Sequence, residues 1–356
     1  MEHRLREFGS EYEWSANHRY LRPAHPAFPG AAGYRSGRDA MKAVAAAVKD
    51  RYSRVLLPAL CCSSMVTPFT DHGFGAVFYR LGPDYRADAA QVETLLTTHT
   101  VLIYGSYFGI EPFSEATLQD LRRRYPGVLF MEDRTQDIFL PRQSRAFDPD
   151  VTVASFRKWT AVPDGGLLWS GSLTCAPGKE DDTFARLWRE AMEMKDRYLH
   201  TGDQALKDRY RAMLAQASDL LDLSPEPYGM APETEELLQR LDLAKMLSRR
   251  VENAHALEQA LTPAVRTGAV KLPVSAEQCS TVYFPILVED QTATQRALAQ
   301  AGIFCPVIWP VPEGALGVCP VAEYTAAHML GVPCDHRYDA NDMAHIGAEI
   351  VRITNE

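Results

Sequence analysis

Short apolar runs alternate with amphipathic segments from about residue 37 to residue 155, and this alternation constrains the fold more than any other feature of the 356-residue sequence. The runs RVLLPALC, GAVFYRLG, TVLIYGSYFG, GVLFMED and VTVASF have the length and apolar content of buried strands. Segments between them, such as MKAVAAAVKDRY and ATLQDLRRRYPG, carry apolar residues at helical spacing. Strands and helices that alternate every 25 to 30 residues, roughly, predict an α/β domain with a mainly parallel sheet flanked by helices.

The second half of the chain is organised differently. A long charged helical stretch is expected from about Thr183 to Ala217, interrupted around HTGDQ, and SPEPYGMAPET is expected to be a connection. The periodic stretch LLQRLDLAKMLSRRVENAHALEQAL predicts one helix leading into a second unit, in which STVYFPILVED and IFCPVIW are expected strands and QTATQRALAQAG and NDMAHIGAEIVRIT expected helices. We therefore expect an N-terminal segment and a large domain over residues 1–235, and a smaller α+β domain over residues 236–356.

Composition and charge argue against several classes of protein. The formal net charge of -9 leaves no basic excess to neutralise phosphates, so a nucleic-acid partner is not expected. The sequence has no stretch of roughly eighteen apolar residues, so no membrane span is expected. The charged N-terminus lacks the apolar core of a signal peptide. The seven cysteines form no Cys-x-x-Cys pair, which favours reduced thiols and a cytoplasmic location. The ten dispersed histidines predict no metal site.

The stretch YRSGRDAM opens an expected helix. Free N–H groups in its first turn, at Ser36, Gly37 and Arg38, would bind an anion such as a phosphate. Taken alone, the stretch is better explained by Ser36 as an ordinary N-cap, since most Ser-Gly helix starts are N-caps. Arg38 is expected either to reach the anion or to form an ion pair with Asp39 or Asp71.

A second polar group ends the expected central strand in FMEDRTQD. Asp133 follows the buried run VLFM, so its carboxylate is expected to be partly buried and to need a partner. Gln136, three residues later, would reach the same ligand. A capping acid before a loop is the alternative for this stretch.

A third polar group ends another strand in VTVASFRKWTAVPDGG. Lys158 follows the strand directly and precedes a tight turn, so its ammonium group is expected to enter the same crevice at the strand ends. A lysine in apolar surroundings has a lowered pKa and becomes nucleophilic. Ser155 and Arg157 would donate hydrogen bonds to an anion. A single loop lysine is usually solvated; the presence of Asp133 and of the helix start at Gly37 favours a site.

Together, the three groups match a ligand that has a phosphate, a protonated ring nitrogen and an aldehyde. This combination predicts pyridoxal 5'-phosphate, with Lys158 for the aldehyde, Asp133 for the pyridinium nitrogen and the helix start at Gly37 for the phosphate. The charge of Asp133 would keep the ring nitrogen protonated, and Lys158 would serve as the general base that moves the substrate proton.

These motifs resemble, over most of the chain, the fold-type I PLP-dependent enzymes, specifically the DegT/StrS-type aminotransferases. YRSGRDAM resembles the family's Ser-Gly-Thr/Arg-x-Ala helix start, MEDRTQD its Glu-Asp-x-x-Gln motif and SFRKWTAVPDGG its Ser-Phe-x-Lys segment. The resemblance implies a large domain with a mainly parallel seven-stranded-type sheet, and a homodimer with active sites at the subunit interface. It places Lys158 as the imine lysine, Asp133 on the pyridine nitrogen, Gln136 near the ring hydroxyl and Ser155 on the phosphate. Cys62 occupies the position that usually stacks an aromatic ring on the cofactor.

Two departures from the family pattern concern the substrate. Members that act on nucleotide sugars usually have more residues between the serine and the lysine, followed by Gly-Glu-Gly-Gly, whereas Ser155 and Lys158 are close together here and Pro-Asp-Gly-Gly follows. The Asn-Tyr-Arg-Met stretch that reaches the neighbouring subunit is reduced to PYGM. A nucleotide-sugar substrate therefore does not follow from the sequence.

Three further residues are candidates for contact with substrate. Tyr107 and Trp309 are expected to wall the pocket, with core packing and a domain-interface anchor as the respective alternatives. Arg157 is the third candidate.

We expect an aminotransferase that moves an amino group from a small-molecule donor to a keto or aldehyde acceptor, a sugar or a small biosynthetic intermediate. A PLP-dependent lyase, or other chemistry at Cα or Cβ of an amino acid, is the alternative, and a catalytically silent family member is a further one. A nicotinamide-binding enzyme is not expected, because no Gly-x-Gly-x-x-Gly follows the first strand.

Overall fold

The computed structural model describes residues 5–138, 147–176, 178–223 and 225–355. Its largest element is a seven-stranded sheet of order β2-β8-β7-β6-β5-β3-β4. The five strands β4, β3, β5, β6 and β7 are parallel, and β8 is antiparallel to both of its neighbours. The strands are β2 (Ala32–Tyr34), β3 (Arg54–Pro58), β4 (Gly75–Tyr79), β5 (Thr100–Gly105), β6 (Leu129–Asp133), β7 (Val151–Ser155) and β8 (Gly166–Ser170). The predicted α/β fold with a mainly parallel sheet is confirmed.

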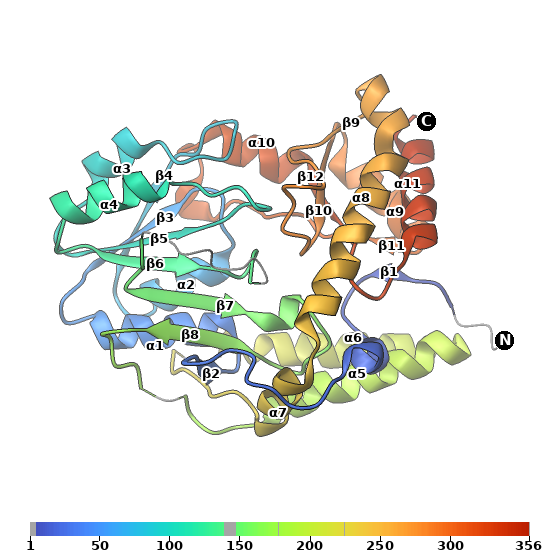
Figure 1. The fold of residues 1–356 in the computed structure, drawn as a ribbon, viewed down its shortest axis with the longest axis horizontal. Coiled ribbons are helices and arrows are strands. Elements are labelled where there is room, and N and C mark those ends of the chain that lie inside the picture. Colours follow the sequence, from blue (N-terminus) through green and yellow to red (C-terminus); the bar gives the residue numbers. More distant parts are fainter. Residues whose placement is uncertain (1–4, 139–146, 177, 224, 356) are drawn as a thin grey trace.

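Helices cover both faces of this sheet. They are α1 (Gly37–Val48), α2 (Ser63–Thr70), α3 (Ala89–Leu95) and α4 (Glu115–Arg124), and Figure 1 shows α3 and α4 on one side of the sheet and α1 on the other. α1 begins where the sequence predicts, because the Ser36 side chain accepts a hydrogen bond from the Asp39 N–H and caps the helix. α1 packs on β7 and β8.

The long helical stretch forms a hairpin of α5 (Thr183–Thr201) and α6 (Gln204–Asp219), with the predicted interruption at Gly202, whose φ is 72°. The prediction of a single helix over the periodic stretch that follows is wrong. The structure has two helices there, α7 (Pro232–Arg240) and α8 (Leu243–Thr267). Asp242 causes the break, because its side chain accepts the Lys245 N–H as an N-cap while the backbone before it is extended.

The C-terminal part contains a three-stranded sheet of order β12-β10-β9. The strands are β9 (Val270–Lys271), β10 (Phe284–Val288) and β12 (Met329–Val332), and the helices are α9 (Gln291–Gln300), α10 (Pro320–His328) and α11 (Ala340–Thr354). The sequence pattern does not predict β9, α10 or β12, which are all short. The α+β character of this part is as expected, although the proposed boundary after residue 235 falls inside α7 and the division stays a prediction.

The strand predicted over IFCPVIW is shorter than expected. Only β11 (Ile303–Phe304) forms, because Pro306 has no N–H to donate to a ladder. β11 pairs in parallel with β1 (Phe8–Gly9), so the N-terminal segment is attached to the C-terminal part of the chain. Tertiary contact, not sequence proximity, places this segment.

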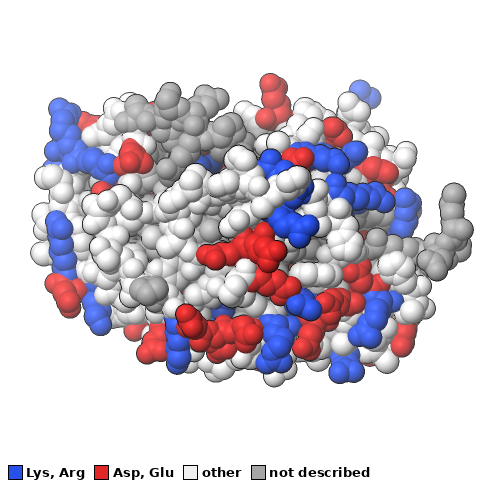
Figure 2. All heavy atoms as spheres, turned by 60° about the horizontal axis from the view of Figure 1, so that its bottom comes forward, with Lys and Arg blue, Asp and Glu red and all other residues white. Residues whose placement is uncertain are grey.

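Surface charge is mixed. Figure 2 shows one face on which acidic and basic side chains lie among each other, beside a broad area with few charges. Among the described residues, no helix has the combination of length and apolar character that crossing a membrane requires. All seven cysteines are free thiols.

Candidate functional site

Three neighbouring strands bring polar residues to one edge of the large sheet. Gly105, the last residue of β5, pairs with Asp133, the last residue of β6, and β7 ends beside them at Ser155. Thr135 joins the ends of β6 and β7: its N–H donates to Asp133 Oδ1 at 2.8 Å, and its Oγ1 accepts the Ser155 N–H at 3.1 Å. The ends of β6 and β7 are therefore held in a fixed relation.

Asp133 lies at this edge without full access to water. Burial raises the pKa of its carboxyl, against the opposite effects of the Thr135 hydrogen bonds and of the Lys158 charge. A carboxyl in this state gains from a nearby cation, which restores its ionised form. The site thus favours a cationic group close to Asp133.

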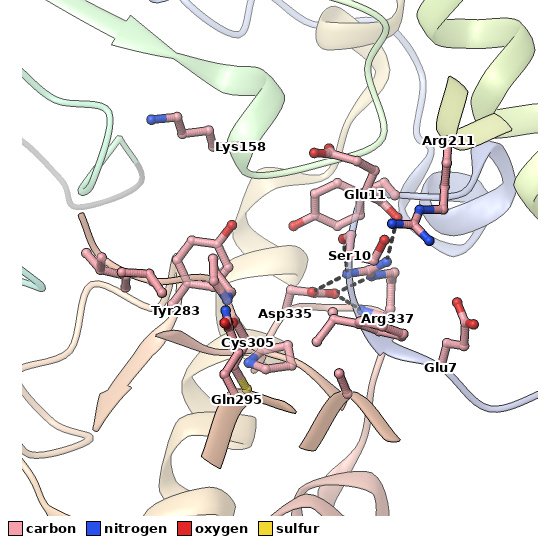
Figure 3. A pocket seen from close by; sticks show the side chains of 18 of the residues that line it. Glu7, Ser10, Glu11, Lys158, Arg211, Tyr283, Gln295, Cys305, Asp335 and Arg337 are labelled. Carbon is pink, nitrogen blue, oxygen red and sulfur yellow. Dashed lines mark hydrogen bonds and ion pairs between the residues drawn. The ribbon is translucent and has the colours of Figure 1, made fainter. Parts of the chain in front are cut away.

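Lys158 stands between two cavities. It follows β7 in a short 3-10 helix (Phe156–Lys158) and, with Gln136 and Trp309, lines both a cavity of about 770 Å³ and a narrower recess. In Figure 3 its side chain points away from the Asp335–Arg337 pair at the far side of the large cavity. The recess is lined by Pro58, Leu60, Cys62, Met65, Gly105, Ser106, Tyr107, Asp133, Thr135, Gln136, Lys158 and Trp309.

Six residues predicted from the sequence are thus brought together around the recess: Cys62, Tyr107, Asp133, Gln136, Lys158 and Trp309. Cys62 precedes α2 as its N-cap residue, and its Sγ lies 2.8 Å from the Ser64 hydroxyl. Tyr107 also has a structural role, since its hydroxyl donates to the Leu60 carbonyl at 2.5 Å. Ser106, between Gly105 and Tyr107, was not singled out from the sequence, because one serine after a strand carries no signal.

The N-terminus of α1 lies against Ser155. A Cβ added to Gly37 would be 3.2 Å from Ser155 Cβ, and one added to Gly166 would be 2.0 Å from the Ser36 carbonyl oxygen. Glycine at position 166 therefore lets the start of α1 approach the sheet closely. Ser36, Gly37 and Ser155 are buried and line neither cavity.

Two N–H groups at this helix start have no partner within the helix. Ser36 caps the helix through the Asp39 N–H, which leaves those of Gly37 and Arg38 as first-turn donors that a helix does not bond internally. The N-cap alternative for Ser36 is correct, and it coexists with a potential anion site rather than excluding it.

Arg38 does not form the ion pair predicted with Asp39 or Asp71. It pairs with Asp222, whereas Asp39 is held by Arg35 through two hydrogen bonds of 2.9 Å. The loop after α6 supplies Asp222, and the sequence pattern does not indicate this long-range approach.

Arg157 lines the large cavity, and its guanidinium lies over the Trp188 ring at 4.2 Å. The Nε–H groups of Arg38 and Arg157 are both buried, and neither has a hydrogen-bond partner within the described part of the chain.

The side of the large cavity away from Lys158 is built from three distant segments: the N-terminal segment, α6 and the C-terminal part. Tyr283 and Glu11 face its interior in Figure 3. Arg337 is neutralised there by Asp335 at 2.8 Å and Glu13 at 3.2 Å. Sequence reasoning missed these residues, because only tertiary contacts bring the three segments together.

Among the described residues, no three potential metal ligands lie together.

Known proteins resemble this chain in structure but not detectably in sequence. No family model and no curated protein matches the sequence. Solved structures match in fold. A DegT DnrJ EryC1 StrS aminotransferase from Brucella abortus has a TM-score of 0.61 at 17% identity, covering 96% of this chain and 93% of that one.

The aminotransferase TlmJ from Streptoalloteichus hindustanus has a TM-score of 0.64 at 16% identity, covering 98% of each chain. NtdA from Bacillus subtilis, solved with bound cofactor PMP, has a TM-score of 0.64 at 16% identity, covering 92% of this chain and 73% of that one. This protein therefore has the fold of these aminotransferases, the fold type that the sequence motifs implied.

Proposed function

We propose that this protein is a pyridoxal phosphate-dependent aminotransferase of the DegT/StrS type. The observation that carries the proposal is the meeting of Lys158, Asp133 and Gln136 around one recess at the carboxyl edge of the sheet. The shared fold supports it, since solved structures of this fold include NtdA with bound PMP.

Several buried polar atoms fit such a cofactor. Gln136 and Ser106 line the recess, and neither Gln136 Oε1 nor Ser106 Oγ has a hydrogen-bond partner in the described part of the chain. The Nε–H groups of Arg38 and Arg157 also lack a hydrogen-bond partner there. A buried polar atom left unpaired costs about 1–3 kcal/mol, so these atoms favour a polar ligand. For a phosphate, the Gly37 and Arg38 N–H groups beside Ser155 offer donors at a helix N-terminus.

Each residue then has a defined task. Pyridoxal phosphate, when bound, supplies the electron sink that stabilises negative charge at the substrate Cα. Asp133 would hold the ring N–H as a carboxylate, because a positive ring would stabilise the ionised form against the effect of burial. Lys158 would hold the aldehyde group of the cofactor through Nζ, and the same atom would carry a proton to and from the substrate. Trp309 lies where the recess meets the large cavity and limits the access of water.

The large cavity is the proposed substrate site. Its volume of about 770 Å³ and its mixture of acidic, basic and aromatic side chains suit polar molecules larger than an amino acid. We propose a small-molecule amino donor and a polar keto or aldehyde acceptor, either a sugar or a small biosynthetic intermediate. A homodimer and a cytoplasmic location complete the proposal, the first from the family resemblance and the second from seven free cysteines.

The first test is to incubate the purified protein with pyridoxal phosphate, reduce it with borohydride and map the product by mass spectrometry. A phosphopyridoxyl group on the peptide SFRKWT, at Lys158, is expected. Adding glutamate and other amino donors before reduction should convert the bound cofactor to its pyridoxamine form. Persistence of the starting absorbance with every common donor would reject transamination, and release of ammonia with a keto acid would favour the lyase. Failure to take up the cofactor would favour a silent relative.

A further inference from the structure

Trp159, directly after Lys158, connects the segment that carries Lys158 to the segment that carries Asp133. The side chain is fully buried, and its indole Nε1–H donates to the Thr135 carbonyl at 2.7 Å. Thr135 in turn donates its own N–H to Asp133 Oδ1 at 2.8 Å. The backbone next to Lys158 is therefore connected to the acid through two hydrogen bonds, and a movement of the indole ring would displace both groups.

Arg250, in α8, holds Trp159 in place in two ways. Its Cζ lies over the indole ring, 5.0 Å from the ring centroid, and its Nη2 donates to the Trp159 carbonyl at 2.5 Å. The first contact is a cation–π interaction and the second a charge-assisted hydrogen bond. The ring and the backbone of Trp159 are thus both constrained by one guanidinium group.

The same guanidinium also contacts the rest of the molecule. Nη1 donates to the Thr281 carbonyl at 2.7 Å, in the C-terminal part, and Nη2 donates to the Tyr12 hydroxyl at 2.8 Å, in the N-terminal segment. Nη2 also lies 3.4 Å from His336 Nδ1. Burial, and next the Arg250 charge, lower the pKa of His336 to about 3, so the imidazole is neutral and its nitrogen accepts.

A guanidinium buried this completely is costly for folding unless hydrogen bonds compensate it, and an apolar side chain of similar size would avoid the cost. Arg250 lines neither cavity. Its partners are instead the indole and carbonyl of Trp159, and groups of Tyr12, Thr281 and His336 in two segments that build the substrate cavity. Arg250 therefore fixes the positions of other residues and does not itself contact a ligand in either cavity.

We propose that Arg250 is a positioning residue for Lys158 and Asp133 and acts on both through Trp159. The inference rests on the proposed function. Because Arg250 also binds Thr281 and Tyr12, a shift of the C-terminal part or of the N-terminal segment is transmitted to the lysine and the acid. The state of the substrate cavity is thereby coupled to the cofactor site.

The test compares Arg250→Met with Asn253→Ala. Asn253 is a matched control: it lies in the same helix, is equally buried, and donates to the carbonyls of Cys334, Asp335 and Tyr338 but not to Trp159. Both variants should melt at a lower temperature than the wild type. Arg250→Met should also weaken pyridoxal phosphate binding about tenfold and shift the pH midpoint of the bound cofactor's absorbance, with Arg250→Lys intermediate. Asn253→Ala should leave both quantities within about twofold.

Trp159→Phe is the second variant, for the case that Arg250→Met does not fold. It removes the indole N–H but leaves an aromatic ring below Arg250, so the same shift in pH midpoint is expected. Equal effects of Arg250→Met and Asn253→Ala on cofactor affinity would overturn the inference, as would an unchanged pH midpoint in both Arg250→Lys and Trp159→Phe. A wild type that takes up no pyridoxal phosphate would reject the proposed function itself, a result distinguishable from either.

Discussion

The proposed cofactor end and substrate end of the site are built in opposite ways. At the cofactor end, backbone N–H groups, glycines and short side chains from adjacent strands pack closely, and Ser36 and Ser155 are only 4% and 6% exposed. At the substrate end, long charged side chains such as Glu11, Arg211 and Arg296 come from three separate segments and reach a cavity of about 770 Å³.

The two ends should therefore differ in how well they tolerate amino-acid substitutions. A closely packed end cannot admit extra atoms, whereas long side chains at a cavity wall adjust at little cost. We therefore expect substitutions of the closely packed residues at the cofactor end to alter folding and cofactor binding together, and substitutions at a cavity wall to leave the fold unchanged. Four variants test this contrast, from the largest expected effect to the smallest.

Lys158→Ala should abolish the chemistry. Loss of the nucleophile and proton carrier is expected to reduce transamination about a thousandfold or more, with no phosphopyridoxyl peptide after borohydride reduction. The circular dichroism spectrum should be that of the wild type, since Lys158 lies at a cavity wall. Near-normal turnover would remove Lys158 from its proposed role.

Gly166→Ala should destabilise the fold by about 3 kcal/mol, because the new Cβ would lie 2.0 Å from the Ser36 carbonyl oxygen and push α1 away from the sheet. Gly171→Ala is the matched control, since a Cβ there meets nothing within 4 Å. Urea unfolding of both variants measures the effect. Equal stabilities would show that the helix start is not held closely against β8.

Asp164→Asn should change how stability depends on pH. Burial raises the pKa of the Asp164 carboxyl to about 7, against a hydrogen bond from the Ala231 N–H of 2.9 Å. The folded protein thus binds a proton more tightly than the unfolded chain, so this group lowers stability as pH rises from about 4 to about 7. The asparagine variant should show a flatter profile over this range, measured by melting temperature, and be more stable than the wild type at pH 8.

Glu11→Gln should have the smallest effect on the fold. The Glu11 backbone carbonyl accepts from Arg337 at 3.3 Å and also from Lys195, so its position is held without the carboxylate. The free energy of unfolding should change by less than about 0.5 kcal/mol, and cofactor affinity should be unchanged. The KM for the acceptor should change several-fold, roughly, because the group facing the cavity loses its charge. A weaker affinity for pyridoxal phosphate would contradict the separation of the two ends.

The cofactor end could be predicted from the sequence for a specific reason. Asp133 and Lys158 each follow a buried strand closely, and parallel strands place their carboxyl ends at one edge of a sheet. The Ser36 cap marks the helix that starts beside them. Each signal lies within a few residues of the element it ends, so hydrophobic pattern and spacing are sufficient to find it.

Elements that depend on distant partners escaped prediction. The break at Asp242 lies within an uninterrupted apolar period, and its cap is visible only once the helix is known to start there. The pairing of β1 with β11 joins Phe8 to Ile303, and two-residue strands have no periodicity to detect. Nothing in the sequence indicates Asp222 as the partner of Arg38, since the two lie far apart in the chain.

By itself, then, the sequence determined the α/β order around the seven-stranded sheet and the identity of the residues at its strand ends, because these are local consequences of hydrophobic spacing. Only the tertiary structure decided how Arg250 joins Trp159, Thr281 and Tyr12, and which segments enclose the large cavity. Contacts between residues far apart in the chain depend on how whole elements pack, and no short stretch of sequence encodes that geometry.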